Sequence, residues 1–249
     1  MRSPPLVISA VERDETRAGM ARLHDELYAS SVPSVSPRAC VMGEVAPVVV
    51  ARFADVPDID ADLGLLTTAE LARHGRLVAA ADKQAYVAAH ILVRECSAEL
   101  LGAHREDVVI RQRCGRCGAV EHGAPAVADA PGIWVSLSHT RGQVAAVAAT
   151  RRCGIDVERV SRGPDRALSS REAAWVAGQQ DAAYAFTRLW VRKEALVKAG
   201  HGSMAAAQRL DVLADNGPAD QLGGARITQW EAPGFLGAVA ICADRRTGN

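Results

Sequence analysis

The chain has 249 residues, of which 49% are hydrophobic and 23% are charged, and its 29 basic residues balance its 29 acidic ones. A formal net charge of zero argues against a nucleic-acid binder, which normally carries a basic domain. No apolar run approaches the roughly 20 residues of a membrane span, and six scattered cysteines suit a reducing compartment. We therefore expect a monomeric cytoplasmic protein with no membrane contact, built as one large domain or two small ones.

The first 44 residues differ in character from the rest of the chain. They contain one amphipathic stretch, in which Leu23 and Leu27 are four residues apart, followed by a linker rich in Ser and Pro. We expect residues 1–44 to form an N-terminal extension that is partly disordered.

Residues 45–151 are predicted to form an N-terminal lobe. A β-branched run beginning at Val48 predicts a strand, and helices are expected near residues 67–75 and 82–101, with His90 on a core or interface side. Residues 134–150 then show a strand, a tight turn at Arg141 and Gly142, and a second strand. The lobe should therefore combine helices with an antiparallel sheet.

A CxxC pair, Cys114 and Cys117, is followed by His122 and could indicate a zinc site. A structural zinc site needs four ligands, and no second cysteine pair occurs at ligand spacing. A reduced surface loop is the favoured interpretation of this segment.

Residues 152–249 are predicted to form a C-terminal lobe that opens with the sequence GIDVE. As a strand, this segment would bury Ile155 and Val157 and place Asp156 and Glu158 together on its other face. A helix capped at Ser169 or Ser170 and a C-terminal hairpin complete the lobe. Two such lobes make an α+β protein with a candidate site at the seam between them.

The sequence WVRKEALVK, from Trp190 to Lys198, is a second candidate motif. As a helix it places Trp190, Glu194 and Lys198 along one stripe, with Lys193 beside it. Three of the 29 basic residues are Lys and the other 26 are Arg, yet two of the three Lys lie in this motif. A compact ammonium suits contact with a phosphate oxygen.

Three carboxylates, those of Asp156, Glu158 and Glu194, would repel one another unless a cation lay between them. Mg²⁺ fits because it uses few protein carboxylates and takes further ligands from substrate phosphates. Each motif alone also fits an ordinary exposed strand or helix. Their combination predicts a magnesium site that acts on a phosphate-bearing substrate.

Ser138 and His139 end a strand just before the acidic motif. Adjacent strand residues point to opposite faces, so these two side chains do not easily form a nucleophile and base pair. Binding of phosphate by the hydroxyl and the imidazole is the favoured interpretation.

The order SLSHT, GIDVE and WVRKEALVK resembles the 4'-phosphopantetheinyl transferase superfamily, specifically its larger Sfp-type (surfactin-synthetase type) members. The resemblance runs from about Val48 to Ile241. It implies two lobes related by a pseudo-twofold axis, with transfer of phosphopantetheine from coenzyme A (CoA) to a serine of an apo carrier protein. Fatty acid, polyketide and nonribosomal peptide synthesis all use such carriers.

The resemblance also implies roles for particular residues. Asp156, Glu158 and Glu194 match the family's magnesium ligands, and Glu194 is also the expected base for the serine hydroxyl. Lys198 matches a catalytic lysine at the CoA pyrophosphate.

The other residues that the resemblance implies are CoA contacts. Ser138 and His139 match the phosphate-binding motif, Lys193 is expected near the phosphates, and Arg73 and Arg76 resemble a basic helix near the 3'-phosphate.

One departure from the family pattern is Ala124, which stands where a phosphate-binding lysine is common. It leaves open a CoA-binding or carrier-binding module that does not catalyse transfer. A second alternative is a magnesium-dependent hydrolase of nucleotide pyrophosphates, which would use water in place of the carrier serine.

Overall fold

The computed structural model describes residues 46–114, 117–120 and 123–243. The extension expected at residues 1–44 and His122 of the possible zinc site lie outside this range. Within it, four α-helices and antiparallel sheets form a mixed α+β fold, which confirms the predicted class.

A five-stranded antiparallel sheet makes up the first half of the chain. Its order is β1 (Val49–Asp55), β5 (Gln143–Ala149), β4 (Trp134–Thr140), β3 (Ala124–Val127) and β2 (Ile110–Arg113). Two helices accompany it, α1 (Thr68–Arg76) and α2 (Ala80–Leu101), together with short 3-10 turns at Val56–Asp58, Leu63–Leu65 and Arg105–Asp107.

A four-stranded antiparallel sheet makes up the second half. Its order is β6 (Cys153–Arg159), β11 (Phe235–Cys242), β10 (Ala225–Ala232) and β9 (Gln221–Leu222). It is accompanied by α3 (Ser170–Ala177), α4 (Ala182–Lys198), a small ladder of β7 (Leu213–Ala214) with β8 (Gly217–Pro218), and 3-10 turns at Asp165–Ala167 and Met204–Arg209.

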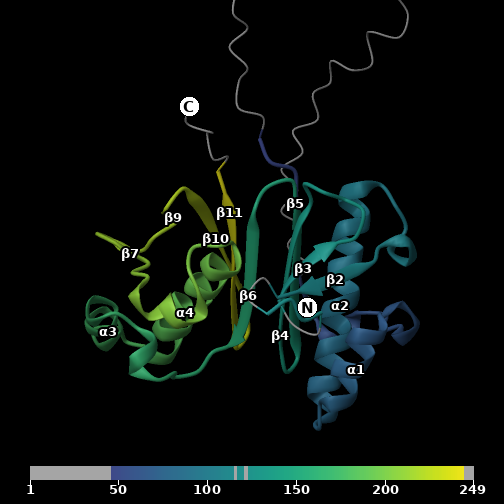
Figure 1. Cartoon of the computed structure of the whole chain (residues 1–249). Coiled ribbons are helices and arrows are strands. Elements are labelled where there is room, and N and C mark those ends of the chain that lie inside the picture. The colour runs from purple at the N-terminus through teal and green to yellow at the C-terminus, as the bar shows by residue number, and fades with distance from the viewer. Residues whose placement is uncertain (1–45, 115–116, 121–122, 244–249) are drawn as a thin grey trace, which may run out of the picture.

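The layers run α2, first sheet, second sheet, α4, and Figure 1 shows the two long helices on opposite outer faces. Between the sheets lies an apolar layer that includes Phe53, Val147, Ile155 and Val239. β5 is buried along its whole length because α2 covers one face and the second sheet covers the other. The two sheets therefore share a continuous core, and their seam is rigidly packed.

Each half repeats one local arrangement. The short helices α1 and α3 both begin with a capping box, formed by Thr67 with Glu70 and by Ser169 with Glu172. Both glutamates are also buried and pair with a cation on the following long helix, Glu70 with Arg94 and Glu172 with Lys193. This repetition gives the two halves the same helix-to-helix clamp.

None of the helices in the described ranges is long and apolar enough to cross a membrane.

Candidate functional site

The acidic site begins on β6, where side chains alternate between two environments. Ile155 and Val157 enter the layer between the sheets, while Asp156 and Glu158 lie on the face toward α4. The sequence-predicted alternation is confirmed. Glycine at position 154 is required here, because a Cβ would lie 2.0 Å from the Ala195 carbonyl oxygen. The missing side chain lets α4 rest directly on β6.

α4 supplies the opposing groups. The Lys198 ammonium lies 2.7 Å from Asp156 Oδ1 and also donates to the carbonyl oxygen of Ile155 at 3.1 Å. Glu194, one turn earlier on the same stripe, is close enough that its charge and those of Asp156 and Lys198 act on one another. Figure 1 shows α4 lying beside β6, as this pairing requires.

Ser138 joins the cluster from the other half of the chain. Its hydroxyl donates to Asp156 Oδ1 at 2.7 Å across the seam between β4 and β6. Asp156 is only 2% exposed, and its other oxygen, Oδ2, is buried and accepts no hydrogen bond from the residues that the structure describes. A buried carboxylate oxygen without a donor is costly, so this atom suits a positive ligand.

Two carboxyl groups of the cluster have raised pKa values. Burial, together with the negative charge of Asp156, raises the pKa of Glu158 to about 7 and that of Glu194 to about 7, while Lys198 acts in the opposite direction. At neutral pH these groups exchange protons readily. Glu158 and Glu194 can therefore accept either protons or a further cation.

The donor set fits a hard divalent cation, since it consists of carboxylate oxygens. Among the described residues, however, no group of three or more His, Cys, Asp or Glu side chains is arranged to hold a metal ion as it stands. The Lys198 ammonium lies on Asp156 Oδ1 and partly neutralises the cluster, while Asp156 Oδ2 accepts no hydrogen bond from the described residues.

His139 lies next to the cluster but on the opposite face of β4 from Ser138, as strand alternation predicts. Its ring meets that of Tyr86 edge to face, with centroids 6.0 Å apart. Burial of the ring lowers the pKa of His139 below its ordinary value, and the charges of His90 and Lys198 lower it further. The imidazole is therefore neutral at neutral pH and can donate or accept a hydrogen bond.

Arg73 and Arg76 reach the same region from α1. Burial raises the pKa of Tyr86 to about 12, and the guanidinium groups of Arg73 and Arg76 oppose this rise. Arg73 also acts on His139. Both arginines are exposed, so α1 brings two cations to the rim beside His139.

Lys193 is not brought into this group. Its ammonium lies 2.5 Å from Glu172 Oε2 and donates to the carbonyl oxygen of Ala167 at 3.1 Å, and both charged side chains are 0% exposed. An ammonium held in this way faces away from any solvent-accessible phosphate. Sequence reasoning missed this pair, although the S-x-x-E capping pattern at Ser169 marked Glu172 as a special position.

A second buried group was also missed. Glu70 accepts from Arg94 Nη2 at 2.7 Å and is bonded to His90 Nδ1 at 2.6 Å, with all three side chains buried. The expectation that His90 lies on a core or interface side is confirmed, since His90 is buried. The signal that could have identified the group is again a capping pattern, Thr67 with Glu70, followed by a cation on a mostly apolar helix.

Comparison with protein families agrees with the acidic site. Residues 152–236 match the family model described as ACPS, the 4'-phosphopantetheinyl transferase superfamily. The matched segment contains Asp156, Glu158, Glu194 and Lys198. That family uses CoA as co-substrate, typically with a divalent metal, and acts on carrier proteins. No protein with a curated description matches the chain.

Proposed function

We propose that this protein is an Sfp-type 4'-phosphopantetheinyl transferase, which moves phosphopantetheine from CoA to a serine of an apo carrier protein. The observation that carries the proposal is the cluster of Asp156, Glu158, Glu194 and Lys198, held at the seam of the two sheets by Ser138. The family match over residues 152–236 supports the same reaction class. The lobes are taken as residues 45–151 and 152–249.

The chemistry assigned to the cluster is a displacement at phosphorus. The carrier serine oxygen attacks the β-phosphorus of CoA, and its proton passes to the Glu194 carboxylate. The bond from that phosphorus to the bridging oxygen breaks, so adenosine 3',5'-bisphosphate leaves. Glu194 suits this role because its pKa of about 7 allows it to hold and release a proton near neutrality.

Mg²⁺ is the proposed metal, held by Asp156, Glu158 and Glu194, and it would neutralise charge on the substrate phosphates. Asp156 Oδ2, which is buried without a hydrogen-bond donor among the described residues, supports this assignment. Lys198 leaves Asp156 when the phosphates arrive and binds the pyrophosphate as a point charge.

The remaining phosphate contacts are assigned to Ser138, His139, Arg73 and Arg76. Ser138 and His139 lie at the end of β4, and Arg73 and Arg76 lie on α1. The assignment is supported by the charges that act on neighbouring pKa values: Arg73 and Lys198 both affect His139, and Arg73 and Arg76 both affect Tyr86. We place Lys193 outside this set, because its buried ion pair with Glu172 leaves it no access to a phosphate.

The carrier is proposed to dock on the arginine-rich rim that follows β6. Arg159 stacks on the Phe235 ring at 4.8 Å and donates to the Arg141 carbonyl oxygen across the seam, while Arg162 and Arg166 are exposed on the next loop. Charge of this sign suits a partner that is acidic around its modified serine. Swapping Arg162 and Arg166 for Glu should raise the carrier KM and leave CoA binding unchanged.

The decisive experiment is the intact mass of a purified apo carrier protein after incubation with this protein, CoA and Mg²⁺. A gain of one phosphopantetheine that disappears with chelator and in Glu194→Gln supports the proposal. CoA binding without a gain on several carriers favours a binding module, and Ala124→Lys would then test the missing contact. Release of free 4'-phosphopantetheine without a carrier would identify a hydrolase instead.

A further inference from the structure

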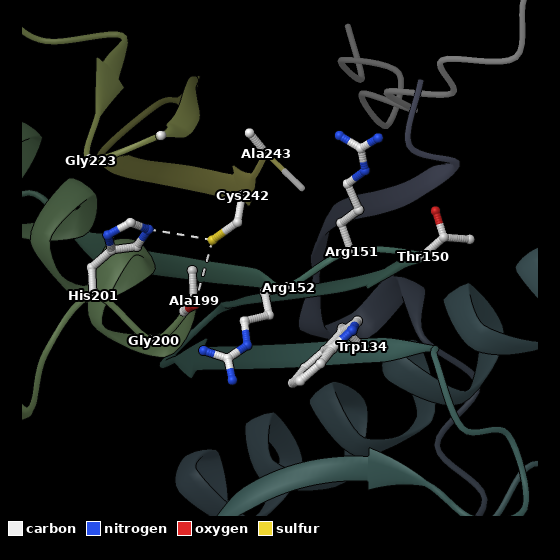
Figure 2. Close-up of a pocket in the computed structure, with 11 residues that line it drawn as sticks. Trp134, Thr150, Arg151, Arg152, Ala199, Gly200, His201, Gly223, Cys242 and Ala243 are labelled. Carbon is white, nitrogen blue, oxygen red and sulfur yellow. Dashed lines mark hydrogen bonds between the residues drawn. The ribbon is translucent and has the colours of Figure 1, made fainter. Parts of the chain in front are cut away.

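A cavity of about 490 Å³ lies at the opposite end of β6 from the acidic site, where β6 begins and β11 ends. Figure 2 shows its wall, which includes Trp134, Arg152, His201 and Cys242. β4 runs from Trp134 at this cavity to His139 at the acidic site, a distance of about 17 Å at the usual rise per strand residue. No residue of the acidic cluster lines the cavity, although Ala199, which does, directly follows Lys198.

Its polar lining is positively charged. The Arg152 guanidinium lies 5.0 Å from the centre of the Trp134 ring, which is 44% exposed. The same group reaches the end of α4, where a Cβ on Gly200 would lie 3.2 Å from Arg152 Nη1. Arg151 also lines the cavity, and none of the described residues that line it is Asp or Glu. An anion entering here meets cations and no competing carboxylate of that lining.

The floor of the cavity is built by closely packed groups. His201 Nε2 lies 3.3 Å from Cys242 Sγ, and that sulfur is 3.6 Å from the Ala199 carbonyl oxygen. On the other side of the imidazole, a Cβ on Gly223 would lie 3.0 Å from Nδ1, so glycine is needed for this approach. Figure 2 shows the contacts of Cys242 with His201 and Ala199 as dashed lines, and they hold the ring beside the thiol.

A second cavity of about 650 Å³ adjoins the first. The two share five lining residues, namely Arg151, Gly223, Gly224, Cys242 and Ala243. Its own lining is mainly apolar and includes Pro47, Val49, Leu222, Val239 and Ile241. A cationic cavity therefore borders a mainly apolar one, and both volumes are in the range of small-molecule sites.

We propose that the paired cavities bind a small amphipathic anion, with a carboxylate or phosphate head group at Arg152 and an alkyl tail in the apolar cavity. Charge complementarity selects the head group, and burial of methylene groups against Leu222 and Ile241 selects the tail. The site does not depend on the proposed transferase activity, because no residue of the acidic cluster lines it.

The test uses the full chain and calorimetric titration without CoA or metal. Decanoate and decyl phosphate serve as anionic probes, decanol as the neutral probe of equal length, and octanoate as the shorter one. We expect decanoate to bind about 16-fold more tightly than octanoate, since each of the two additional methylenes contributes about fourfold. Arg152→Gln should weaken decanoate binding about tenfold and leave decanol unchanged, whereas Arg162→Gln, on the distant rim, should alter neither.

Protection of Cys242 from alkylation shows where the probe binds. Decanoate should slow the reaction of Cys242 with iodoacetamide, followed by peptide mass spectrometry, while the exposed Cys117 reacts at an unchanged rate. A preference for decyl phosphate over decanoate would assign the head group as phosphate, and the reverse would assign it as carboxylate. Absence of binding, equal binding to wild type and Arg152→Gln, or an unprotected Cys242 would each overturn the proposal.

Discussion

The ammonium of Lys193 and the carboxylate of Glu172 lie 2.5 Å apart with no solvent exposure on either side chain. Glu172 also accepts from the backbone N–H of Ser169 at 2.8 Å and of Val212 at 2.9 Å, so its charge is shared by donors from three segments. This clamp fixes the rotation of α4 about its own axis. Glu194, the next residue, is held toward Asp156 as a consequence.

Removing one partner of this clamp should strongly destabilise the protein. Lys193→Met leaves the Glu172 carboxylate buried without its cation, and we expect a loss of about 3–5 kcal/mol in the free energy of unfolding, measured by urea titration. The double variant Lys193→Met/Glu172→Gln removes both charges and should recover much of that loss. If Lys193 instead contacts CoA, the double variant will regain stability but keep a raised KM for CoA.

Gly154→Ala should separate α4 from β6. The added Cβ would lie 2.0 Å from the Ala195 carbonyl oxygen, so the backbone must move, at a cost of about 3 kcal/mol. We expect lower stability together with loss of carrier modification, since the distance between Glu194 and Asp156 changes. Gly75→Ala is the matched control, because nothing lies within 4 Å of its added Cβ. Equal stability of the two variants would contradict the close packing of α4 on β6.

Mg²⁺ binding should depend on pH in a defined direction. The pKa of Glu158 and that of Glu194 are both about 7, so both groups are mostly protonated at pH 6 and mostly ionised at pH 8. Since the metal must displace those protons, we expect its Kd to fall by about 10- to 100-fold between pH 6 and pH 8. Calorimetry in buffers of different ionisation enthalpy counts the protons released. Glu158→Gln should lower that count, and zero release in the wild type would refute the metal assignment.

Glu70 should make the stability of the protein depend on pH under acidic conditions. Burial alone would raise its pKa, but hydrogen bonds from His90 and Arg94 lower it from 4.5 to about 2. Its stabilising contribution is therefore present above pH 4.5 and is lost as the pH falls toward 2. Glu70→Gln should reduce the free energy of unfolding at pH 7 by about 2 kcal/mol and flatten its decline below pH 4.5. Parallel pH curves for wild type and variant would show that the ion pair contributes nothing.

Local periodicity was enough to predict the elements that carry the site. Alternation along β6 placed Asp156 and Glu158 on one face, and the helical spacing of α4 placed Glu194 and Lys198 on one stripe. The cap of α3 at Ser169 followed from a side chain that bonds its own backbone a few residues away. All these features depend on neighbours within one or two turns, so sequence alone determined them.

The pairing of groups from distant segments was decided by tertiary packing. Lys193 and Lys198 occupy the same helix, yet one is buried against Glu172 and the other lies on Asp156. Sequence could not distinguish them, because the difference depends on which face of α4 meets α3 and which meets β6. The cavity at Arg152 is likewise formed by five separate segments of the chain. Such contacts arise only when the two sheets and their helices close on one another, and no local pattern encodes that geometry.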